Sequence, residues 1–324
     1  MIKTPQFWTK RNMLSYGLLP LSFLYFLIHF LIKIFTKKQK ISKPVICIGN
    51  LIAGGSGKTP TAIALGKIFQ ELKIDFAYLS RGYKSDGSKF LMLKKNGNNN
   101  PAKVGDEPVL LSEIATTFVA KDRFFGASRI ERMKNIQALI LDDGMQNNNL
   151  EFDFTIMVID GNLAFGNEFL IPAGPMREPL NSGLKRVDLI VVIGKLDEKN
   201  KAKLKDKLIV NAKIKAVNLE EFRDKKLFAF AGLAYPQKFF QTLKNNNLEI
   251  VGTKEFYDHY AYKNSDLEKL MNLARKQNAK LITTKKDWVK FSPKYKEKIS
   301  YLDIELEFDD KELIKMQLAK FLCK

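Results

Sequence analysis

Short apolar runs alternate with segments of helical spacing between Pro44 and about Val217. Helical spacing is clearest over Thr61–Leu72 and Val109–Ala115. Such alternation predicts a parallel sheet that is covered by helices on both faces. The apolar runs that we expect to form its strands are Val45–Ile48, Phe76–Ser80, Thr117–Val119, Ala138–Leu141, Thr155–Ile159 and Leu189–Ile193.

A second strand-and-helix pattern begins near Lys226. Two strand-like runs, Lys213–Leu219 and Ser300–Phe308, flank it and are able to pair as a two-stranded hinge. The pattern predicts a smaller α/β domain. Its expected strands are Leu227–Ala231, Glu249–Thr253 and Lys280–Thr283, with helices after Pro236 and around Ser265–Gln277.

A length of 324 residues is typical of two domains. We predict a sheet domain over residues 41–220 and a smaller α/β domain over 221–308, joined by the strand hinge. The final stretch has the spacing of an amphipathic helix, so we assign residues 309–324 to a C-terminal helix.

Near the N-terminus, Leu14–Ile32 contains no Asp, Glu, Lys or Arg. Its length is close to the roughly 20 apolar residues that a spanning helix needs, although Pro20 and His29 weaken the pattern. Several lysines follow the run, and it is not followed by the small residues that mark a signal-peptide cleavage site. Three interpretations stay open: a helix that spans a membrane, one that lies in its interface, or one docked on the protein. We predict that residues 1–40 form a membrane-associated helix.

The charge changes this picture by suggesting partners. A formal net charge of +19 is compatible with nucleic acid, an anionic membrane or an acidic substrate. Because the sequence has no zinc-ligand spacing and no aromatic-basic signature, we expect no nucleic-acid partner and favour an anionic membrane surface and an anionic ligand. Two cysteines, Cys47 and Cys323, give no disulfide framework, which favours a reducing compartment.

The stretch Val45–Thr59 reads VICIGNLIAGGSGKT. A strand, a glycine-rich turn and a helix start follow one another here, as in phosphate-binding loops. Small residues allow backbone N–H groups to approach phosphate oxygens, and the helix N-terminus adds the positive end of its dipole. Ile52 stands where the usual loop has its first glycine. The alternative is an incidental glycine-rich turn.

The phosphate-loop interpretation assigns a role to each side chain that follows the turn. Lys58 can reach the β- and γ-phosphates, and Thr59 can place its hydroxyl on Mg²⁺. The residues expected to bind the nucleotide are Gly54, Gly55, Ser56, Gly57, Lys58 and Thr59.

Two acidic segments are candidates for chemistry. Asp142 and Asp143 follow the strand Ala138–Leu141, where an acid can hold Mg²⁺ directly or through water, although Gly144 also fits a simple turn. Asp106 lies in the sequence Gly-Asp-Glu-Pro before a helical run. Its carboxylate could orient or deprotonate an attacking hydroxyl, or merely occupy the first turn of a helix.

Two further segments combine charge with constrained or titratable groups. In Ile171–Pro179, three prolines stiffen the chain around Arg177 and Glu178; arginine can stabilise a transferring phosphoryl group, or the segment is a rigid connector with a surface ion pair. Asp258 precedes His259, and a carboxylate beside histidine can tune its proton affinity, although loop histidines are often structural.

These segments occur in an order that resembles the tetraacyldisaccharide 4′-kinase family, the lipid A 4′-kinases. The match covers most of the chain, including the smaller domain and the N-terminal hydrophobic helix. Asn147 stands where many members carry histidine, so the resemblance assigns no role there. The matching motifs are GNLIAGGSGKTP from Gly49, SRGY from Ser80, GDEP from Gly105, LDDGMQN from Leu141, PAGPMREP from Pro172, DHYAY from Asp258 and ITTKKD from Ile282.

The resemblance implies a P-loop NTPase-like fold of two α/β domains that close over the site. It implies that ATP and Mg²⁺ are used to phosphorylate the 4′-hydroxyl of a lipid-linked glucosamine disaccharide 1-phosphate. The family's proposed base corresponds to Asp106, assisted by His259, and Arg177 is placed on phosphate. Asp142 and Glu178 correspond to metal-linked acids. The expected setting is the cytoplasmic face of a Gram-negative inner membrane, with the protein as a monomer.

Two other functions remain as alternatives. A membrane-associated GTPase or nucleotide switch is suggested by Gly194-Lys195-Leu196-Asp197, which resembles a guanine-reading motif with glycine in place of asparagine. The other alternative is a membrane-docked nucleotide binder without catalytic activity. That reading leaves Asp106 and the segment around Arg177 without a role.

Overall fold

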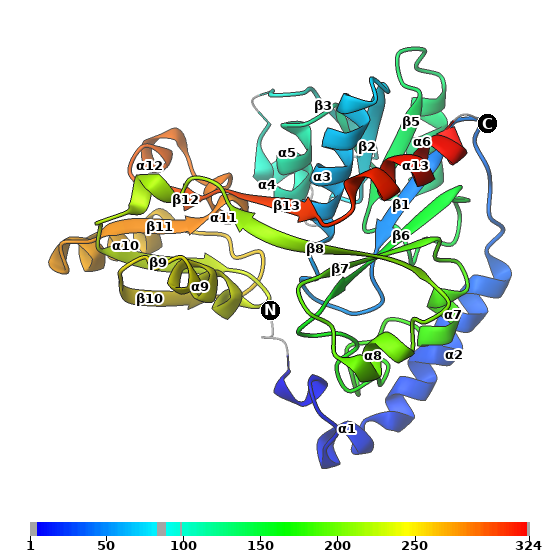
Figure 1. Ribbon diagram of the computed structural model, residues 1–324, viewed down its shortest axis with the longest axis horizontal. Coiled ribbons are helices and arrows are strands. Elements are labelled where there is room, and N and C mark those ends of the chain that lie inside the picture. Colours follow the sequence, from blue (N-terminus) through cyan, green and yellow to red (C-terminus); the bar gives the residue numbers. More distant parts are fainter. Residues whose placement is uncertain (1–4, 83–88, 98, 323–324) are drawn as a thin grey trace.

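We describe the protein from a computed structural model that covers residues 5–82, 89–97 and 99–322 (Figure 1). The N-terminal and C-terminal ends of the predicted terminal helices, and Tyr83 of the SRGY motif, lie outside the described residues. Within the described part, nine strands form a large sheet and four form a smaller one. This arrangement confirms the predicted α/β fold class.

The large sheet has the strand order β13-β8-β7-β6-β1-β5-β2-β4-β3. Its strands pair in parallel except at the two ends, where β3 is antiparallel to β4 and β13 to β8. All six strands predicted for it are present, while β3 was not predicted. The strands are β1 (Val45–Gly49), β2 (Phe76–Ser80), β3 (Leu91–Leu93), β4 (Thr117–Val119), β5 (Ala138–Asp142), β6 (Phe154–Asp160), β7 (Leu189–Ile193), β8 (Leu208–Ala216) and β13 (Ile304–Phe308).

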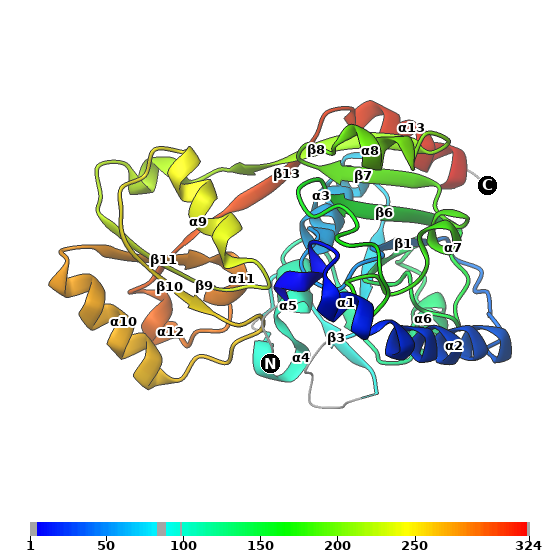
Figure 2. The same cartoon turned by 90° about the horizontal axis from the view of Figure 1, so that it is seen from below.

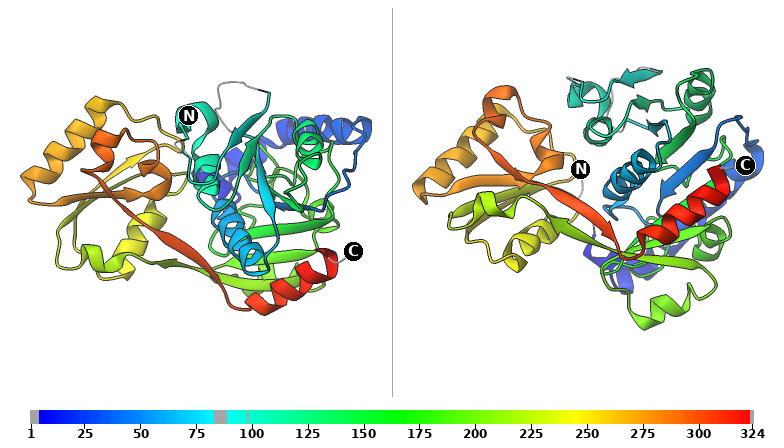
Figure 3. Two further views of the ribbon diagram at one scale, coloured as in Figure 1. Left: turned by 90° about the horizontal axis from the view of Figure 1, so that it is seen from above. Right: turned by 45° about the horizontal axis from the view of Figure 1, so that its top comes forward.

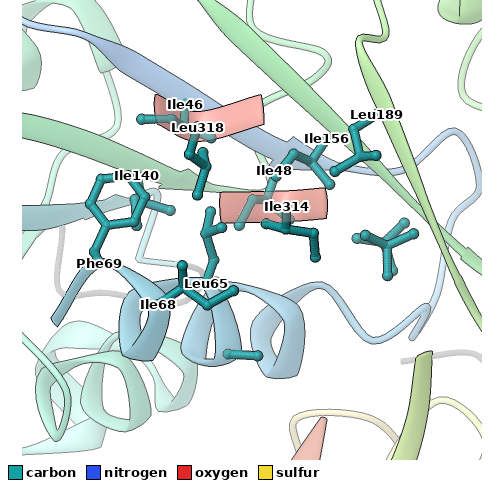
Figure 4. Packing of buried hydrophobic residues seen from close by; sticks show 14 of the residues in the cluster. Ile46, Ile48, Leu65, Ile68, Phe69, Ile140, Ile156, Leu189, Ile314 and Leu318 are labelled. Atoms are coloured by element: carbon teal, nitrogen blue, oxygen red, sulfur yellow. The ribbon is translucent and has the colours of Figure 1, made fainter. Parts of the chain in front are cut away.

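Helices and buried side chains fix β1 at the centre of this sheet. Ile46 and Ile48 point to one face, where they pack with Leu65 of α3 and with Ile314 and Leu318 of α13 (Figure 4). Burying each such side chain contributes roughly 2 kcal/mol, so the start of α3 is held firmly after β1. The helices around this sheet are α3 (Lys58–Glu71), α4 (Pro101–Val104), α5 (Asp106–Ser112), α6 (Arg123–Glu131), α7 (Leu180–Leu184), α8 (Glu198–Ala202) and α13 (Lys311–Leu322).

The smaller sheet is parallel throughout, in the order β10-β9-β11-β12. Its strands are β9 (Leu227–Gly232), β10 (Ile250–Phe256), β11 (Lys280–Thr284) and β12 (Ser300–Leu302), preceded by the 3₁₀ turn η2 (Leu219–Phe222). The helices of this part are α9 (Pro236–Asn245), α10 (Asn264–Lys276), α11 (Lys285–Trp288) and α12 (Pro293–Lys296).

Two strands connect the sheets. The first half of β8 pairs with β7, and its second half, Ala212–Ala216, pairs with β13 (Figure 3). The predicted pairing of the two flanking runs is therefore confirmed in part. Ser300–Phe308 is not one strand, because it divides at Asp303 into β12 of the small sheet and β13 of the large one.

The N-terminal apolar run forms two helices after the short 3₁₀ turn η1 (Gln6–Trp8): α1 (Met13–Gly17) and α2 (Leu19–Phe35). Pro20 lies in the first turn of α2, where its missing N–H costs little. Figure 2 shows α2 lying along the larger domain. Among the described residues, no helix combines the length and apolar character that crossing a membrane requires.

One face of α2 docks on the protein through hydrogen bonds. The Ser22 hydroxyl donates to the Leu170 carbonyl (2.8 Å), and the Tyr25 hydroxyl donates to the Arg177 carbonyl (2.9 Å). The rest of the helix exposes large apolar side chains, including Phe23, Leu27 and Leu31. The structure thus combines a docked face with an apolar surface on the same helix.

Candidate active site

The glycine-rich turn after β1 has the backbone of a phosphate-binding loop. Gly57 caps α3 with φ of +85°, in the left-handed region that favours glycine. A Cβ there would lie 2.3 Å from Cδ1 of Ile193, so a side chain has no room. The Ser56 hydroxyl is buried without a hydrogen-bond partner in the described part of the chain. An unpartnered buried hydroxyl at this position fits a phosphate oxygen as its partner.

The unusual Ile52 is explained by the segment that lies beside the loop. Ile52 is buried and forms an antiparallel bridge with Met176. The Ala53 N–H donates to the Pro175 carbonyl (2.7 Å), and the Arg177 N–H donates to the Leu51 carbonyl (2.7 Å). The first half of the loop is therefore held as a short β pairing, where an apolar residue is suitable and a glycine is not needed.

Lys58 is the first residue of α3, and its side chain is 12% exposed. Its ammonium donates to Oδ1 of Asn50 (3.2 Å) and lies 3.7 Å from Oδ1 of Asp143. Burial lowers the pKa of Lys58, against the opposing effect of Asp143. Sequence reasoning missed Asn50, although a polar residue directly after a buried strand is a usable signal.

Thr59 and Asp142 come together as predicted for a Mg²⁺ site. The Thr59 hydroxyl donates to Oδ2 of Asp142 (3.1 Å). Within the described residues, the other carboxylate oxygen of Asp142 is buried and has no hydrogen-bond partner. Burial, together with the nearby Asp143 and Glu107 charges, raises the pKa of Asp142 to about 7. Hard oxygen donors and an unsatisfied buried carboxylate suit a divalent cation, so these two residues fit the expected metal.

Arg177 reaches the same place from the proline-rich segment. Its Nη1 donates to Oδ1 of Asp143 and to Oε1 of Gln146, both at 2.9 Å. Lys58 and Arg177 therefore share Asp143 as a counter-ion. Burial opposes ionisation of Asp143, but Lys58 and Arg177 outweigh it and lower its pKa.

Glu178 does not join Thr59 and Asp142 in the described structure. Its side chain is 1% exposed and forms a paired contact with Arg186, at 2.5 Å to Oε1 and 2.7 Å to Oε2. Gln146 also donates to Oε1 (3.1 Å). Glu178 thus links the proline-rich segment that carries Arg177 to the turn after β5 that carries Gln146. Sequence analysis did not single out Arg186, which lies just after α7 and pairs with Glu178 just before that helix.

Asp106 and His259, which lie far apart in the sequence, are in contact. Asp106 is the first residue of α5, and His259 lies in the turn after β10 with a left-handed φ of +55°. Nδ1 of His259 is 3.0 and 3.1 Å from the two carboxylate oxygens of Asp106. The side chain of His259 is 14% exposed, and that of Asp106 is 5% exposed. The larger and the smaller parts of the chain each supply one member of this pair.

Lysines from the smaller part surround the pair. Lys286 lies 2.8 Å from Oε1 of Glu107, and Lys290 lies 3.5 Å from Oδ2 of Asp106. Asp106, Glu107 and His259 each offer one ligand atom, and these atoms lie within 4.8 Å of one another, close enough to hold a metal ion. The ammonium groups of Lys286 and Lys290 already provide positive charge beside these three side chains.

The charges around Asp106 determine its protonation state. Burial opposes ionisation, but the hydrogen bond with His259 and the charges of Lys286 and Lys290 hold the pKa of Asp106 below its usual range. Burial raises the pKa of the neighbouring Glu107, against the opposing charge of Lys286. Asp106 is therefore a carboxylate at neutral pH, able to accept a hydrogen bond from a hydroxyl.

The smaller part also contacts the phosphate loop directly. Gly54 has φ of +113°, and a Cβ there would lie 3.3 Å from Cε2 of Tyr235. Lys238 of α9 forms an ion pair with Asp160 at the end of β6. The segment between β9 and α9 thus covers the glycines that are expected to bind phosphate. Sequence reasoning did not single out Tyr235.

The guanine-like segment begins directly after Ile193, whose side chain lies against Gly57, and its own residues have local roles. Asp197 is exposed and caps α8, where its carboxylate accepts from the Asn200 N–H (2.8 Å). Gly194 has φ of +84°, so a left-handed turn explains this glycine. The helix cap explains Asp197 and the left-handed turn explains Gly194, so neither residue requires a bound guanine.

A phosphate loop on a mostly parallel sheet, with a metal-suited acid and a buried carboxylate–histidine pair, defines a P-loop enzyme suited to phosphoryl transfer. The profile of the tetraacyldisaccharide-1-P 4′-kinase (LpxK) family matches residues 14–322. The chain belongs to this family. That match supports the kinase interpretation and not the GTPase alternative.

Relatives of known name agree with this assignment. The tetraacyldisaccharide 4′-kinase of Rickettsia typhi is 37% identical over 318 residues, which cover 98% of each chain. The enzyme of the same name from Rickettsia felis is 37% identical over 319 residues, covering 98% of this chain and 96% of that one. The structure of LpxK from Aquifex aeolicus in complex with ATP is similar, with a TM-score of 0.77 and 25% identity, covering 96% of this chain and 100% of that one.

Proposed function

We propose that this protein transfers the γ-phosphoryl group of ATP to the 4′-hydroxyl of a tetraacyl glucosamine disaccharide 1-phosphate, a step of lipid A biosynthesis. The observation that carries this proposal is the Asp106–His259 contact, 3.0 Å long, between the two parts of the chain. Glu107, the neighbour of Asp106, lies near enough to Lys58 and Asp142 to affect their pKa values. A hydroxyl bound by Asp106 would therefore lie close to the phosphate loop.

In the proposed reaction, the acceptor hydroxyl donates a hydrogen bond to Asp106 and its oxygen attacks the γ-phosphorus. The bond between the γ-phosphorus and the bridging oxygen breaks, the hydroxyl proton passes to Asp106, and ADP leaves. His259 holds the carboxylate in orientation. A carboxylate with a lowered pKa suits this role, because a loose phosphoryl transition state asks little of a strong base.

Lys58 and Arg177 stabilise the negative charge on the transferring group. Both are held beside the loop by Asp143, so their positions are set before the nucleotide arrives. Thr59 and Asp142 would hold Mg²⁺, which supplies neutralisation of the triphosphate charge when bound. Glu178 supports this group through Gln146 and Arg186.

We propose that α2 brings the enzyme to its acylated substrate. Its exposed apolar side chains suit the membrane interface, and the net charge of +19 suits anionic head groups and the 1-phosphate. ATP places the reaction on the cytoplasmic face of the inner membrane of a Gram-negative bacterium. A monomer suffices, because one chain supplies both Asp106 and His259.

Incubation of the purified full chain with ATP, Mg²⁺ and the disaccharide 1-phosphate lipid tests the proposal. Mass spectrometry should show one added phosphate on the lipid, and fragmentation should place it on the 4′ position. Loss of product on addition of excess EDTA would support the Mg²⁺ assignment. Unchanged lipid together with nucleotide hydrolysis that strongly prefers GTP would instead support the GTPase alternative.

A further inference from the structure

A lysine of the smaller domain lies against the Asp106–His259 pair and has no role in the reaction described above. Lys286 is the second residue of α11. The start of this helix is fixed by Thr284, whose hydroxyl donates to Oδ2 of the fully buried Asp287 (3.0 Å). The same carboxylate oxygen accepts from the Gly232 N–H (2.8 Å). The backbone that carries Lys286 is therefore held to the core of the smaller sheet.

The Lys286 ammonium joins both parts of the site. It lies 2.8 Å from Oε1 of Glu107 on α5 and 3.4 Å from Oδ1 of Asp258. It also lies 3.4 Å from Nε2 of His259. The side chain is 22% exposed, and its charge is kept because the carboxylates outweigh burial and raise the pKa of Lys286. A positive charge is thus fixed beside the outer nitrogen of the imidazole.

An ammonium group has donors and no acceptor, so the imidazole nitrogen that faces it must be the acceptor. Nε2 of His259 faces Lys286, which leaves the ring proton on Nδ1. Nδ1 is the nitrogen that contacts Asp106. Lys286 therefore favours the tautomer in which Nδ1–H donates to the Asp106 carboxylate.

Glu107 would favour a different state if it were unpaired. Its Oε1 lies 3.5 Å from Nε2 of His259, where it would attract a proton to that nitrogen. Lys286 lies closer to the same oxygen, at 2.8 Å, and neutralises this attraction. The positive charge of Lys286 thus screens His259 from the negative charge of Glu107.

We propose that Lys286 is a positioning residue for the phosphoryl transfer: by donating to Nε2 of His259 and pairing with Glu107, it fixes the Nδ1–H tautomer that orients Asp106 when the two domains meet. This inference rests on the proposed function for its kinetic consequence, although the tautomer itself does not depend on it. The charged and titratable groups that face Lys286 are Asp106 and Glu107 from α5 and Asp258 and His259 from the turn after β10. Lys290, which follows α11, faces Asp106 and pairs with the buried Asp287.

The adjacent lysine provides a matched control. Lys285 lies on the same short helix and also reaches α5, where it pairs with Glu113 at its end (2.8 Å). Its other partner is Asp303 (3.5 Å), and it makes no contact with Asp106 or His259 among the described residues. Lys285→Met therefore removes a lysine that joins the same elements, while the pair itself is left intact.

The first experiment reads the tautomer directly. The chain has two histidines, His29 and His259, so ¹⁵N-histidine labelling gives few imidazole signals, and a His29→Gln variant assigns them. In the nucleotide-free full chain at neutral pH, His259 should show a protonated Nδ1 and an unprotonated Nε2. Lys286→Met should bring a proton to Nε2, whereas Lys285→Met and Lys286→Arg should keep the original pattern.

The second experiment follows turnover of the lipid acceptor. Lys286→Met should lower kcat by roughly tenfold to a hundredfold, the scale of a misplaced proton-handling group, with KM for ATP nearly unchanged. The acidic limb of its kcat–pH profile should move up by about one pH unit, because a cation close to Asp106 is lost. Lys285→Met should show neither effect, and Lys286→Arg should recover part of the activity.

The results that would overturn the inference are specific. They are an unchanged His259 spectrum in Lys286→Met, or equal kinetic losses in Lys285→Met and Lys286→Met. If the wild-type chain does not phosphorylate the lipid at all, the proposed function fails. The spectroscopic arm still decides whether Lys286 sets the tautomer.

Discussion

At the scale of single residues, one carboxylate, Asp143, pairs with the two cations beside the phosphate loop, and nucleotide binding must break these pairs. Asp143 lies 2.9 Å from Arg177 and 3.7 Å from Lys58. Both cations are the groups expected to face phosphate. An incoming triphosphate therefore competes with Asp143 for charges that are already in place, which limits the reorganisation needed on binding.

Replacing Lys58 with alanine should lower kcat by about 10²-fold or more, since one preorganised positive group is lost from the transferring phosphoryl. Lys67→Ala is the matched control, because Lys67 lies on the same helix and pairs with Glu305 on the surface. Initial rates with saturating ATP compare the two variants. Wild-type turnover in a folded Lys58→Ala protein would remove the phosphate-loop assignment.

The raised pKa of Asp142, about 7, predicts a pH-dependent penalty on folding. Such a group binds its proton more tightly in the folded chain, so its contribution to stability is lost as pH rises through 7. Without metal, Asp142→Asn should gain stability relative to the wild type between pH 5 and pH 8, by about 2–3 kcal/mol. Urea unfolding in EDTA at the two pH values measures this difference.

The control for this prediction is Asp309→Asn, which changes a carboxylate that is exposed and remote from the loop. Its effect should be the same at both pH values. If the Asp142→Asn variant shows an advantage that is also independent of pH, the carboxylate is not held in the unfavourable environment that the structure describes.

Residue identities were predictable where a motif specified them. The pairing of Thr59 with Asp142 followed from a phosphate loop and an acid at the end of a neighbouring strand. Asn50 was missed although its place directly after a buried strand is a usable signal. Gln146 was missed because its contacts with Asn50 and Glu178 join segments that are far apart in the sequence. Arg186 was missed because no motif specifies its pairing with Glu178 across α7. Glu178 was expected near the metal, yet its pairing with Arg186 is visible only in three dimensions.

At the scale of elements, α2 has a docked face and an exposed apolar face, a division that a single hydrophobic run could not reveal. Ser22 and Tyr25 bind the carbonyl groups of Leu170 and Arg177, which belong to the segment beside the phosphate loop. Deleting residues 1–36 would therefore disturb the segment beside the phosphate loop as well as the proposed membrane attachment. A test of attachment needs changes on the exposed face alone.

Substituting Phe23, Leu27 and Leu31 with glutamine should weaken binding to anionic vesicles by roughly 10²-fold or more, because each exposed apolar side chain contributes to burial in the interface. ATP affinity should stay near the wild-type value, since the docking side chains remain. Met316→Gln on α13 changes a comparably exposed apolar residue as the control. Full sedimentation of the triple variant with vesicles at high salt would show that another surface is the main anchor.

The strands were predictable because each one is a short apolar run bounded by polar residues. The predicted strand boundaries were wrong where pairing between distant segments determines where a strand ends. The run Ser300–Phe308 looks continuous, yet β12 joins the small sheet and β13 the large one. In the apolar run Leu14–Ile32, Gly17 and Pro20 mark the break at Leu18 between two helices, although the run was predicted as one helix.

At the scale of the whole molecule, contacts between the domains assemble the site. Asp106 meets His259, Glu107 meets Lys286, and Asp160 meets Lys238. The sequence predicted that Asp106 and His259 belong to different domains, so the two residues could act together only if those domains close over the site. The arrangement in the described structure already brings them together, with β8 and β13 as the connection between the sheets.

The last prediction concerns the Asp106–His259 pair as one unit. Asp106→Asn keeps the side-chain shape and removes the charge, while His259→Asn is suitable because asparagine tolerates the left-handed φ of +55°. If both residues act on the same proton transfer, each single variant should lose roughly 10²- to 10⁴-fold in kcat. The double variant should then be little slower than the slower single variant, as for residues that act together. ATP affinity, measured by calorimetry, should be nearly normal in all three, because neither residue is assigned to the nucleotide. Fully multiplicative losses would mean independent roles, in which case His259 would be assigned to substrate positioning and Asp106 would remain the sole group that accepts the hydroxyl proton.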